Sequence, residues 1–345
     1  MPEVHPSRWI RPLASGLAVI DKTGEPYFHI DATRATDTVI VTHGHADHAR
    51  PGHQHVIATP ETLAIMKARY GDRFATRITP LNWHETMHIG DVSFHLVPAG
   101  HVLGSAQIVL DCQGSRVVVS GDYKRKPDPT CAAFEPVACD IFITEATFAL
   151  PVFSHPDPLE EVRKILDSLK QFPHRAHVIG AYSLGKAQRV IALLRQAGYD
   201  KPIFIHGALQ KLCQLYQDHG VPLGTLEAAT SGEKGMPQPA LAGQIVIAPP
   251  SAIADRWSRR LPDPLIIMAS GWMQVKQRAK QSGVELPLIL SDHADWNDLL
   301  ATIEDIKPKE VWITHGREDA LMRALSLKGI TAKALHLIGY EDDAE

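Results

Sequence analysis

Short runs of hydrophobic residues alternate with polar segments along the first part of the chain, residues 1–148. The runs are rich in Val and Ile and are bounded by turn-forming residues, which is the pattern of β-strands. They cover residues 37–41, 55–59, 92–98 and 106–122, and the sequence CQGS predicts a hairpin turn at the centre of the last one. A helical pattern at residues 60–71 interrupts them. The pattern therefore predicts a mainly β region.

Helical patterns alternate with short apolar runs between residues 149 and 287. The predicted helices cover residues 158–172, 184–198 and 208–220, and the predicted strands cover residues 177–182, 202–206, 245–250 and 264–270. This alternation is typical of a small parallel α/β unit. Residues 221–243, rich in Gly and Pro, are expected to form a surface excursion.

The last part of the chain returns to strands that end in polar residues. After the apolar run 286–290 we expect a helix at residues 296–306, a strand at 310–316 and a second helix at 317–329. We find neither an internal repeat nor a low-complexity tract.

The composition is that of a globular chain with one large domain or two modest ones. Of its 345 residues 44% are hydrophobic and 21% are charged, and the net charge of −4 argues against a generally basic, nucleic-acid-coating surface. Any polyanion must therefore bind to a local patch. The sequence shows no secretory signal and no membrane-spanning stretch, which predicts a cytoplasmic protein without membrane association. The 4 cysteines lack C-x-x-C spacing, so we expect neither disulfides nor a thiolate zinc site.

The segment VTHGHADH, residues 41–48, concentrates metal-binding side chains directly after a predicted strand. It places His43, His45, Asp47 and His48 within six positions. A lone histidine at a strand end is usually only a polar residue. Four such groups on one turn have no packing role, and their crowding costs solvation unless a cation compensates it. The run therefore predicts a metal site.

Three more polar residues end apolar strands elsewhere: His101, Asp122 and His315. Imidazoles and carboxylates without a thiolate suit two divalent ions, zinc in the first place, with manganese as the alternative. We expect one ion to bind His43, His45 and His101, the other to bind Asp47, His48 and His315, and Asp122 to bridge them. Such a pair generates a hydroxide at neutral pH and stabilises both oxygens of a displacement.

With these residues in place, the chain resembles the metallo-β-lactamase superfamily over nearly its whole length. Residues 29–48, the segment AGHVLGSAQ and the segment SGDYK look like the successive metal-binding motifs of that superfamily. Glu145 in TEATF, His293 in LSDHADW and His315 in WITHG look like motifs A, B and C of the β-CASP nucleases. Within that branch the chain is similar to the bacterial ligase-associated DNA exonucleases, also described as mRNA 3′-end processing factor-like.

The resemblance implies an α/β fold in which an αββα metallo-β-lactamase sandwich carries an inserted α/β domain. The sandwich would comprise residues 1–148 and 288–345, and the β-CASP domain, which clamps nucleic acid, residues 149–287. Asp31 would orient the metal-binding turn. His293 would protonate the departing sugar oxygen, held in place by Glu145 or Asp292.

The inserted domain is expected to hold phosphate groups of the substrate. Ser183 and Lys186 lie at a predicted helix N-terminus, which favours anions, although Lys186 replaces the Arg that is more usual in the relatives. Ser270 and Trp272 form a similar loop, where Trp272 either stacks on a base or packs between domains. The basic turn Lys124–Lys126 would add positive charge, although a lone charge run is usually a solvated turn.

The function implied is that of a metal-dependent DNA exonuclease in DNA repair, associated with an ATP-dependent DNA ligase and a helicase. The alternative on the same fold is an RNA-processing exo- or endonuclease, because His315 is similar to the RNA-processing relatives. A thioester or lactone hydrolase uses the same metal turn but needs no inserted domain. A catalytically inactive scaffold is disfavoured because every expected ligand position is filled.

Overall fold

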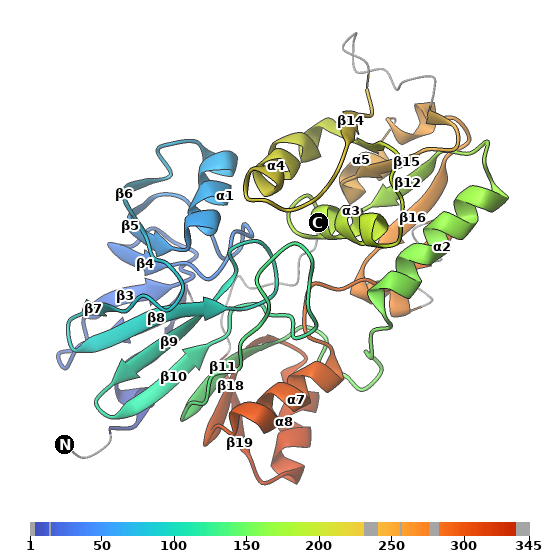
Figure 1. Ribbon diagram of the computed structural model, residues 1–345. Coiled ribbons are helices and arrows are strands. Elements are labelled where there is room, and N and C mark those ends of the chain that lie inside the picture. The colour runs from blue at the N-terminus through green and yellow to red at the C-terminus, as the bar shows by residue number, and fades with distance from the viewer. Residues whose placement is uncertain (1–3, 14, 231–240, 256, 276–282, 336–345) are drawn as a thin grey trace. The chain divides into compact units, whose positions relative to one another are not determined.

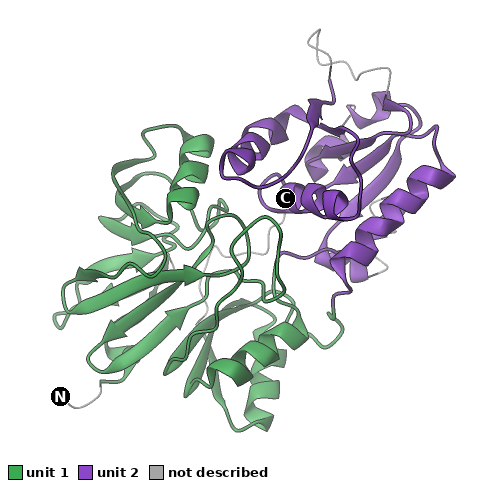
Figure 2. Cartoon of the chain, viewed as in Figure 1, with its two compact units in different colours: residues 1–154, 293–344 green, residues 155–292, 345 purple. Residues whose placement is uncertain are grey.

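The computed structural model describes residues 4–13, 15–230, 241–255, 257–275 and 283–335. By its internal contacts the chain divides into two compact units (Figure 2). Unit 1 comprises residues 1–154 and 293–344, and unit 2 comprises residues 155–292. No helix among the described residues is long and apolar enough to cross a membrane.

Unit 1 contains two mixed β-sheets (Figure 1). The first has the order β1 (Ile10–Leu13), β2 (Gly16–Ile20), β3 (Pro26–Ile30), β4 (Thr38–Ile40), β5 (His53–Ala58) and β6 (Ala75–Pro80). The second has the order β19 (Thr331–Ala334), β18 (Glu310–Gly316), β11 (Ile141–Ala146), β10 (Ser115–Val119), β9 (Ala106–Cys112), β8 (Val92–Pro98) and β7 (Met87–Ile89). β9 and β10 form the predicted hairpin.

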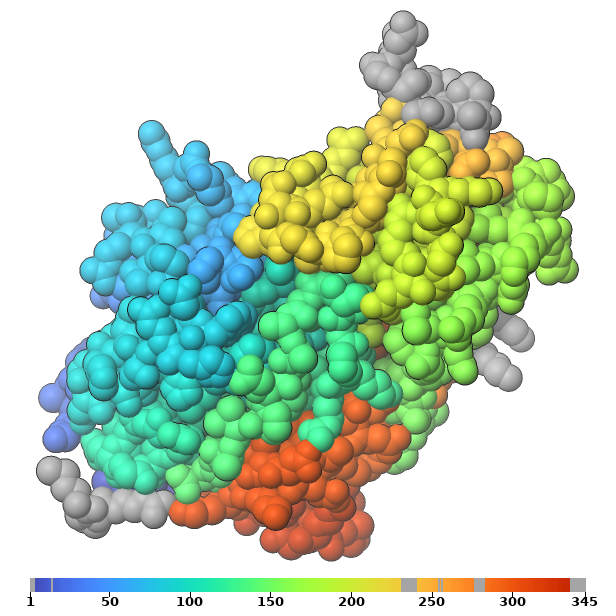
Figure 3. All heavy atoms as spheres, viewed as in Figure 1, coloured from blue at the N-terminus to red at the C-terminus, as the bar shows by residue number. Residues whose placement is uncertain are grey.

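The two sheets pack face to face, and helices cover their outer faces. Apolar side chains of both sheets, such as Phe28 and Phe94, form one buried core between them. α1 (Pro60–Tyr70) packs on the outer face of the first sheet through Leu63 and Met66. α7 (Trp296–Ile306) and α8 (Glu318–Leu327) cover the outer face of the second sheet, and their surface is orange to red in Figure 3. The predicted αββα sandwich is confirmed.

Unit 2 is built on a parallel sheet with the order β14 (Leu226–Ala228), β13 (Ile203–Ile205), β15 (Ile245–Ala248), β12 (His177–Gly180), β16 (Leu265–Ala269) and β17 (Leu286–Leu288). The α-helices among its described residues are α2 (Pro158–Gln171), α3 (Lys186–Gln196), α4 (Gly207–Asp218) and α5 (Pro250–Ala254), and α3 contacts both α2 and α4. The helix–strand alternation therefore forms the parallel α/β unit that the pattern predicts.

One prediction in unit 2 needs correction. The expected surface excursion at residues 221–243 contains β14, which pairs with β13 at the edge of the sheet. Residues 231–240 of that segment lie outside the described residues. An edge strand of three residues with no fully buried side chain gives too weak a hydrophobic pattern to be recognised.

Candidate metal centre

The residues predicted to bind metal follow the ends of strands from both sheets of unit 1. β4 leads into the turn that holds His43, His45, Asp47 and His48, and β8 and β10 lead into the loops with His101 and Asp122. Near the ends of β11 and β18 lie Glu145 and His315. β10, β11 and β18 are parallel neighbours, so their carboxyl ends meet at one edge of the sandwich.

Two glycines that the sequence analysis did not single out shape these loops. Gly121 has a φ of 55°, and a Cβ there would stand 2.8 Å from the Cβ of Thr42. Gly316 has a φ of 103°, and a Cβ there would stand 2.2 Å from the backbone of Ala146. Only glycine fits such positions without strain. The backbone beside Asp122 and His315 therefore depends on these two residues.

Four donor atoms surround the first predicted cation position. His43 Nε2 and His101 Nε2 lie 3.1 Å and 3.0 Å from His45 Nδ1. The same two atoms lie 3.4 Å and 3.7 Å from Asp122 Oδ2. Two donors bound to one tetrahedral zinc ion are separated by about 3.4 Å, since each lies about 2.1 Å from the ion. The geometry therefore fits a tetrahedral cation.

The ligands predicted for the second cation also lie near Asp122. His48 Nε2 is 3.5 Å from Asp47 Oδ2 and 3.6 Å from Asp122 Oδ2, and His315 Nε2 is 3.5 Å from Asp122 Oδ1. Among the described residues, the buried atoms Asp47 Oδ1 and Asp122 Oδ1 have no hydrogen-bond partner. Because buried carboxylate oxygens are normally paired, these two fit a second cation.

Burial shapes the protonation of this centre. It raises the pKa of Asp122, which is 4% exposed, to about 7, and it lowers the pKa of His315 to about 4. Burial, then the neighbouring imidazoles, hold the pKa of His43 well below its ordinary value. Burial alone would lower the pKa of His48, but Asp122, Asp47 and Asp31 outweigh it and raise this pKa well above the ordinary value. A divalent cation would favour the ionised carboxylates and neutral imidazoles that such sites require.

Asp31 orients two of the histidines from a strained backbone conformation. Its φ is 48°, and its carboxylate accepts hydrogen bonds from Thr42 N (2.8 Å), Thr42 Oγ1 (2.6 Å) and His48 Nδ1 (2.8 Å). The Thr42 hydroxyl, having donated its proton to Asp31, is left to accept from His43 Nδ1 at 3.0 Å. In both rings Nδ1 then carries the proton, and Nε2 is left to face Asp122.

His315 is held in the same way from the opposite sheet. The hydroxyl of Thr314 donates to the carbonyl of Thr144 at 3.2 Å and lies 2.9 Å from His315 Nδ1. Sequence reasoning missed both threonines. The dipeptide Thr-His occurs at residues 42–43 and again at residues 314–315, each time at a strand end, and this repeat is the signal that would have found them.

His293 and Glu145 form a hydrogen-bonded pair beside the centre. His293 Nδ1 lies 2.9 Å from Glu145 Oε2, and Glu145 Oε1 accepts from Tyr123 N at 2.9 Å. Burial alone would raise the pKa of Glu145, but the His293 imidazole outweighs it and lowers this pKa. Oxygen or nitrogen atoms of Asp122, Glu145 and His293 lie within 4.8 Å of one another. Glu145 therefore contacts the ring directly.

The predicted phosphate-binding residues all lie in unit 2. Ser183 and Lys186 flank Gly185, the N-cap of α3, and Ser270 caps the short helix η4 (Gly271–Gln274) by accepting from Trp272 N. Lys186 is 4% exposed and pairs with Asp292, its Nζ lying 2.9 Å from Asp292 Oδ2. An ammonium group that is buried and paired does not present its charge to a phosphate at the surface.

The basic turn of unit 1 is likewise engaged with acidic partners. Arg125 forms an ion pair with Asp305, and Lys126 Nζ lies 3.3 Å from Asp295 Oδ2. Both carboxylates belong to the α7 segment. These interactions reduce the positive charge that the turn was expected to contribute.

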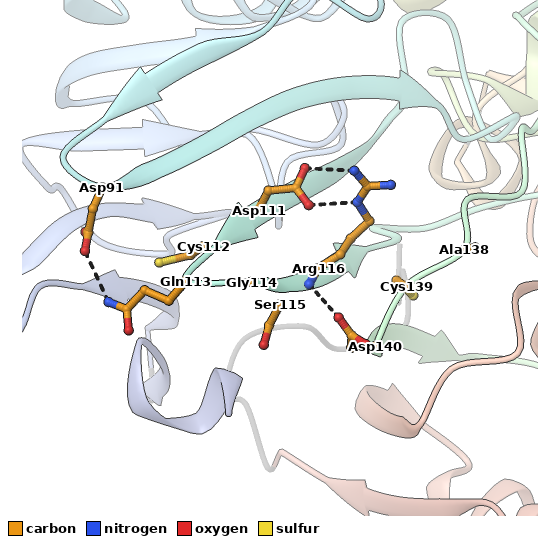
Figure 4. Close-up of a pocket in the computed structure, with 10 residues that line it drawn as sticks. All are labelled: Asp91, Asp111, Cys112, Gln113, Gly114, Ser115, Arg116, Ala138, Cys139 and Asp140. Carbon is orange, nitrogen blue, oxygen red and sulfur yellow. Dashed lines mark hydrogen bonds and ion pairs between the residues drawn. The ribbon is translucent and has the colours of Figure 1, made fainter. Parts of the chain in front are cut away.

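A separate pocket of about 570 Å³ lies at the β9–β10 turn (Figure 4). Its charged side chains already have partners, since Arg116 Nε lies 2.8 Å from Asp111 Oδ1, Asp140 accepts from Arg116 N, and Asp91 accepts from Gln113 Nε2. Burial raises the pKa of Cys112 to about 11 and that of Cys139 to about 12, so neither thiol is reactive at neutral pH. The pocket lies at the opposite ends of these strands from Asp122 and holds none of the predicted site residues.

Comparisons with known proteins agree with this arrangement. A family profile described as "Beta-lactamase superfamily domain" matches residues 18–179, and one described as "Zn-dependent metallo-hydrolase RNA specificity domain" matches residues 287–331. Over 89% of its length the chain is 27% identical to a "Probable DNA ligase" of Opitutus terrae, of which it covers 29%.

Two further relatives carry names from RNA processing. The chain is 23% identical, over 91% of its length, to "Cleavage and polyadenylation specificity factor subunit 3-I" of Arabidopsis thaliana, of which it covers 55%. It is 25% identical, over 60% of its length, to "Endoribonuclease YSH1" of Gibberella zeae, of which it covers 29%. The chain thus spans between about a third and about a half of the length of these relatives.

Proposed function

The chain belongs to the metallo-β-lactamase superfamily, in its β-CASP branch, and from this premise we propose that it is a metal-dependent phosphodiesterase that degrades nucleic acid. The observation that carries the proposal is the position of Asp122. This single buried carboxylate lies between the imidazoles of both ligand groups and next to the pair His293–Glu145. The proposed metal ligands, which would activate water, therefore lie next to His293, the proposed proton donor.

The proposed ligands are those that the sequence predicts. His43, His45 and His101 would hold one divalent cation, Asp47, His48 and His315 would hold the other, and Asp122 would serve both. When bound, two such cations, which we propose to be zinc, supply an activated water and neutralise charge on the phosphate oxygens.

The remaining residues orient groups and move a proton. Asp31, Thr42 and Thr314 fix the imidazole tautomers whose Nε2 atoms face Asp122. Glu145 accepts from His293 Nδ1, which leaves His293 Nε2 to carry the proton for the departing sugar oxygen. We propose that units 1 and 2 act as the metallo-β-lactamase domain and the inserted β-CASP domain.

DNA degraded from an end is the proposed substrate. Support comes from the similarity over 89% of the chain to a relative named as a DNA ligase, in which the matching region is 29% of a longer polypeptide. A matching region within a relative of that name favours an activity that prepares DNA ends for joining. The proposed partner is accordingly a DNA ligase, and the proposed process is DNA repair.

RNA processing is the second candidate, and specific observations favour it. The profile that matches residues 287–331 is described as an RNA specificity domain, and two relatives are named for cleavage and polyadenylation or as an endoribonuclease. As a proposed metal ligand, His315 has the same role with DNA and with RNA, so it does not distinguish deoxyribose from ribose. Discrimination of the 2′-hydroxyl must come from other contacts.

The test uses internally labelled DNA and RNA oligomers of one sequence, each in linear and covalently closed single-stranded form, with zinc or manganese. We expect the linear DNA to be shortened stepwise, its circle to survive, and Asp122→Ala to be inactive. Equal or faster loss of the RNA would establish the second candidate. Cleavage of the DNA circle at a comparable rate would refute the exonuclease assignment, and no cleavage of any oligomer would refute the proposed function.

A further inference from the structure

Two buried cations of α3 converge on the segment directly before His293. Lys186 and Arg189, 4% and 2% exposed, lie one helical turn apart. Lys186 Nζ lies 2.9 Å from Asp292 Oδ2 and donates to the carbonyl of Leu290 at 3.1 Å. Arg189 Nη1 lies 3.2 Å from Asp292 Oδ1 and donates to the carbonyl of Ser291. Three consecutive residues are therefore held by one helix.

Such an arrangement contributes little to stability by itself. Two cations are removed from water, and the attraction of one carboxylate and two carbonyl groups roughly offsets that cost. Apolar side chains of similar volume would stabilise the same packing equally well. The charged groups do hold the segment in one conformation, because each donor bonds to a particular oxygen of the Leu290–Asp292 backbone or of the Asp292 side chain.

The segment that α3 holds directly precedes His293 in the chain. Asp292 is the last residue of unit 2, and the peptide bond that follows it leads to His293 in unit 1. The His293 ring is held at Nδ1 by Glu145, and its centroid lies 4.6 Å from that of His101. Within unit 1 Glu145 thus holds the ring, and within unit 2 α3 holds the residues up to Asp292, which precedes His293 in the chain.

We propose that Lys186 and Arg189, acting through Asp292, are positioning residues that aim the His293 imidazole at the departing oxygen. This inference rests on the proposed function. It also gives Lys186 a different role from the phosphate contact that the sequence predicts.

The proposal makes a prediction that depends on the leaving group. A sugar alkoxide needs a proton to depart, whereas a p-nitrophenolate departs without one. Misplacing a proton donor therefore slows the hydrolysis of nucleic acid and spares that of bis(p-nitrophenyl) phosphate. A loss of metal or a general loosening of the site slows both reactions together.

The experiment compares the zinc-loaded wild type with Lys186→Met and Asp292→Asn on a linear oligonucleotide and on the aryl ester. His293→Ala serves as the reference, and Lys201→Met, the same replacement at an exposed position of unit 2, serves as the matched control. Bound metal and the unfolding temperature are measured for every variant. Asp292→Asn removes only the carboxylate and keeps the hydrogen bonds that Lys186 and Arg189 donate to Leu290 and Ser291. It therefore tests whether the two cations act through Asp292.

We expect Lys186→Met and Asp292→Asn to slow oligonucleotide cleavage roughly 10- to 100-fold, the usual effect of removing a supporting partner of a reactive group. Aryl ester hydrolysis and metal content should stay within about twofold of the wild type, as for His293→Ala, and Lys201→Met should match the wild type on both substrates. Unchanged oligonucleotide rates in the folded variants, or an equal loss on both substrates, would overturn the inference. A wild type that hydrolyses the ester but no nucleic acid would instead refute the proposed function.

Discussion

Replacing Asp31 by Asn tests how the second cation site is built. The carboxylate of Asp31 accepts three hydrogen bonds, from the amide and the hydroxyl of Thr42 and from His48 Nδ1. An amide side chain has one acceptor oxygen and one donor nitrogen. If the nitrogen of Asn faces His48 Nδ1, that atom must accept, and the ring proton moves to Nε2, which faces Asp47 and Asp122. A protonated Nε2 cannot bind a cation.

The opposite orientation of the Asn amide is no better. Its nitrogen would then face the amide nitrogen of Thr42, which lies 2.8 Å from the carboxylate in the wild type, and two buried donors would oppose each other. A buried donor without an acceptor costs about 1–3 kcal/mol. We therefore expect the free energy of unfolding to fall by about that amount, and the affinity for the cation that His48 binds to fall about 10- to 100-fold. That loss equals about 1.4–2.8 kcal/mol of binding free energy.

The assay is a zinc titration of Asp31→Asn in competition with a chromophoric chelator, next to urea unfolding. The matched control is Asp37→Asn, the same chemical change at an exposed position. The ion that His48 binds should be weakened most, and the other ion should be weakened less, because Asp31 reaches its ligand His43 only through Thr42. Two ions bound as tightly as in the wild type would refute the tautomer argument, and a loss confined to the ion that His43 binds would refute the assignment of His48 to the other ion.

Three further predictions concern the whole centre. Asp122→Ala should lose both ions and all cleavage, and elemental analysis that still finds one ion per chain would contradict a bridging role. His293→Ala should keep both ions yet cleave nucleic acid roughly 10²–10⁴-fold more slowly; a lower metal content would place His293 among the ligands. Chelation should abolish activity and lower the unfolding temperature, since a cation at 100 times its dissociation constant stabilises the fold by about 2.7 kcal/mol. Identical melting curves with and without chelator would contradict a cation bound to the native state.

Local patterns predicted much of the fold. The helix at residues 296–306 and the strand at residues 310–316 have the bounds that the sequence predicts. The buried residues of the helix recur on one face, and the strand contains the continuous buried run Val311–Ile313. β6 and β19 escaped prediction since most of their side chains are at least partly exposed, and an edge strand without a buried face leaves no periodic signal. β1 escaped for the same reason, as only its first residue is buried.

The candidate site was predictable to the extent that its signal is local. Four ligands crowd into residues 41–48, so that turn is recognised without any knowledge of the fold. Asp122 and His315 are single residues at strand ends, and only the parallel pairing of β10, β11 and β18 brings them together. The pair Lys186–Asp292 spans more than a hundred positions, and no spacing rule reaches that far. A helix N-terminus at Lys186 therefore indicated a phosphate contact where the structure has an internal ion pair.

The distribution of hydrogen bonds explains why so many imidazoles can share one buried space. Each ring of His43, His48 and His315 directs one nitrogen at the Asp122 side and has the other nitrogen engaged by a hydroxyl or carboxylate behind it. Two of those groups come from the residue that precedes the ligand, so the strand that positions the ring also fixes its tautomer. The three rings are therefore oriented before a cation arrives, and binding requires no reorientation of them, although His48, whose pKa is raised well above its ordinary value, must release a proton. Burial that lowers the pKa of His43 and His315 acts in the same direction, because a neutral imidazole is the form that binds metal.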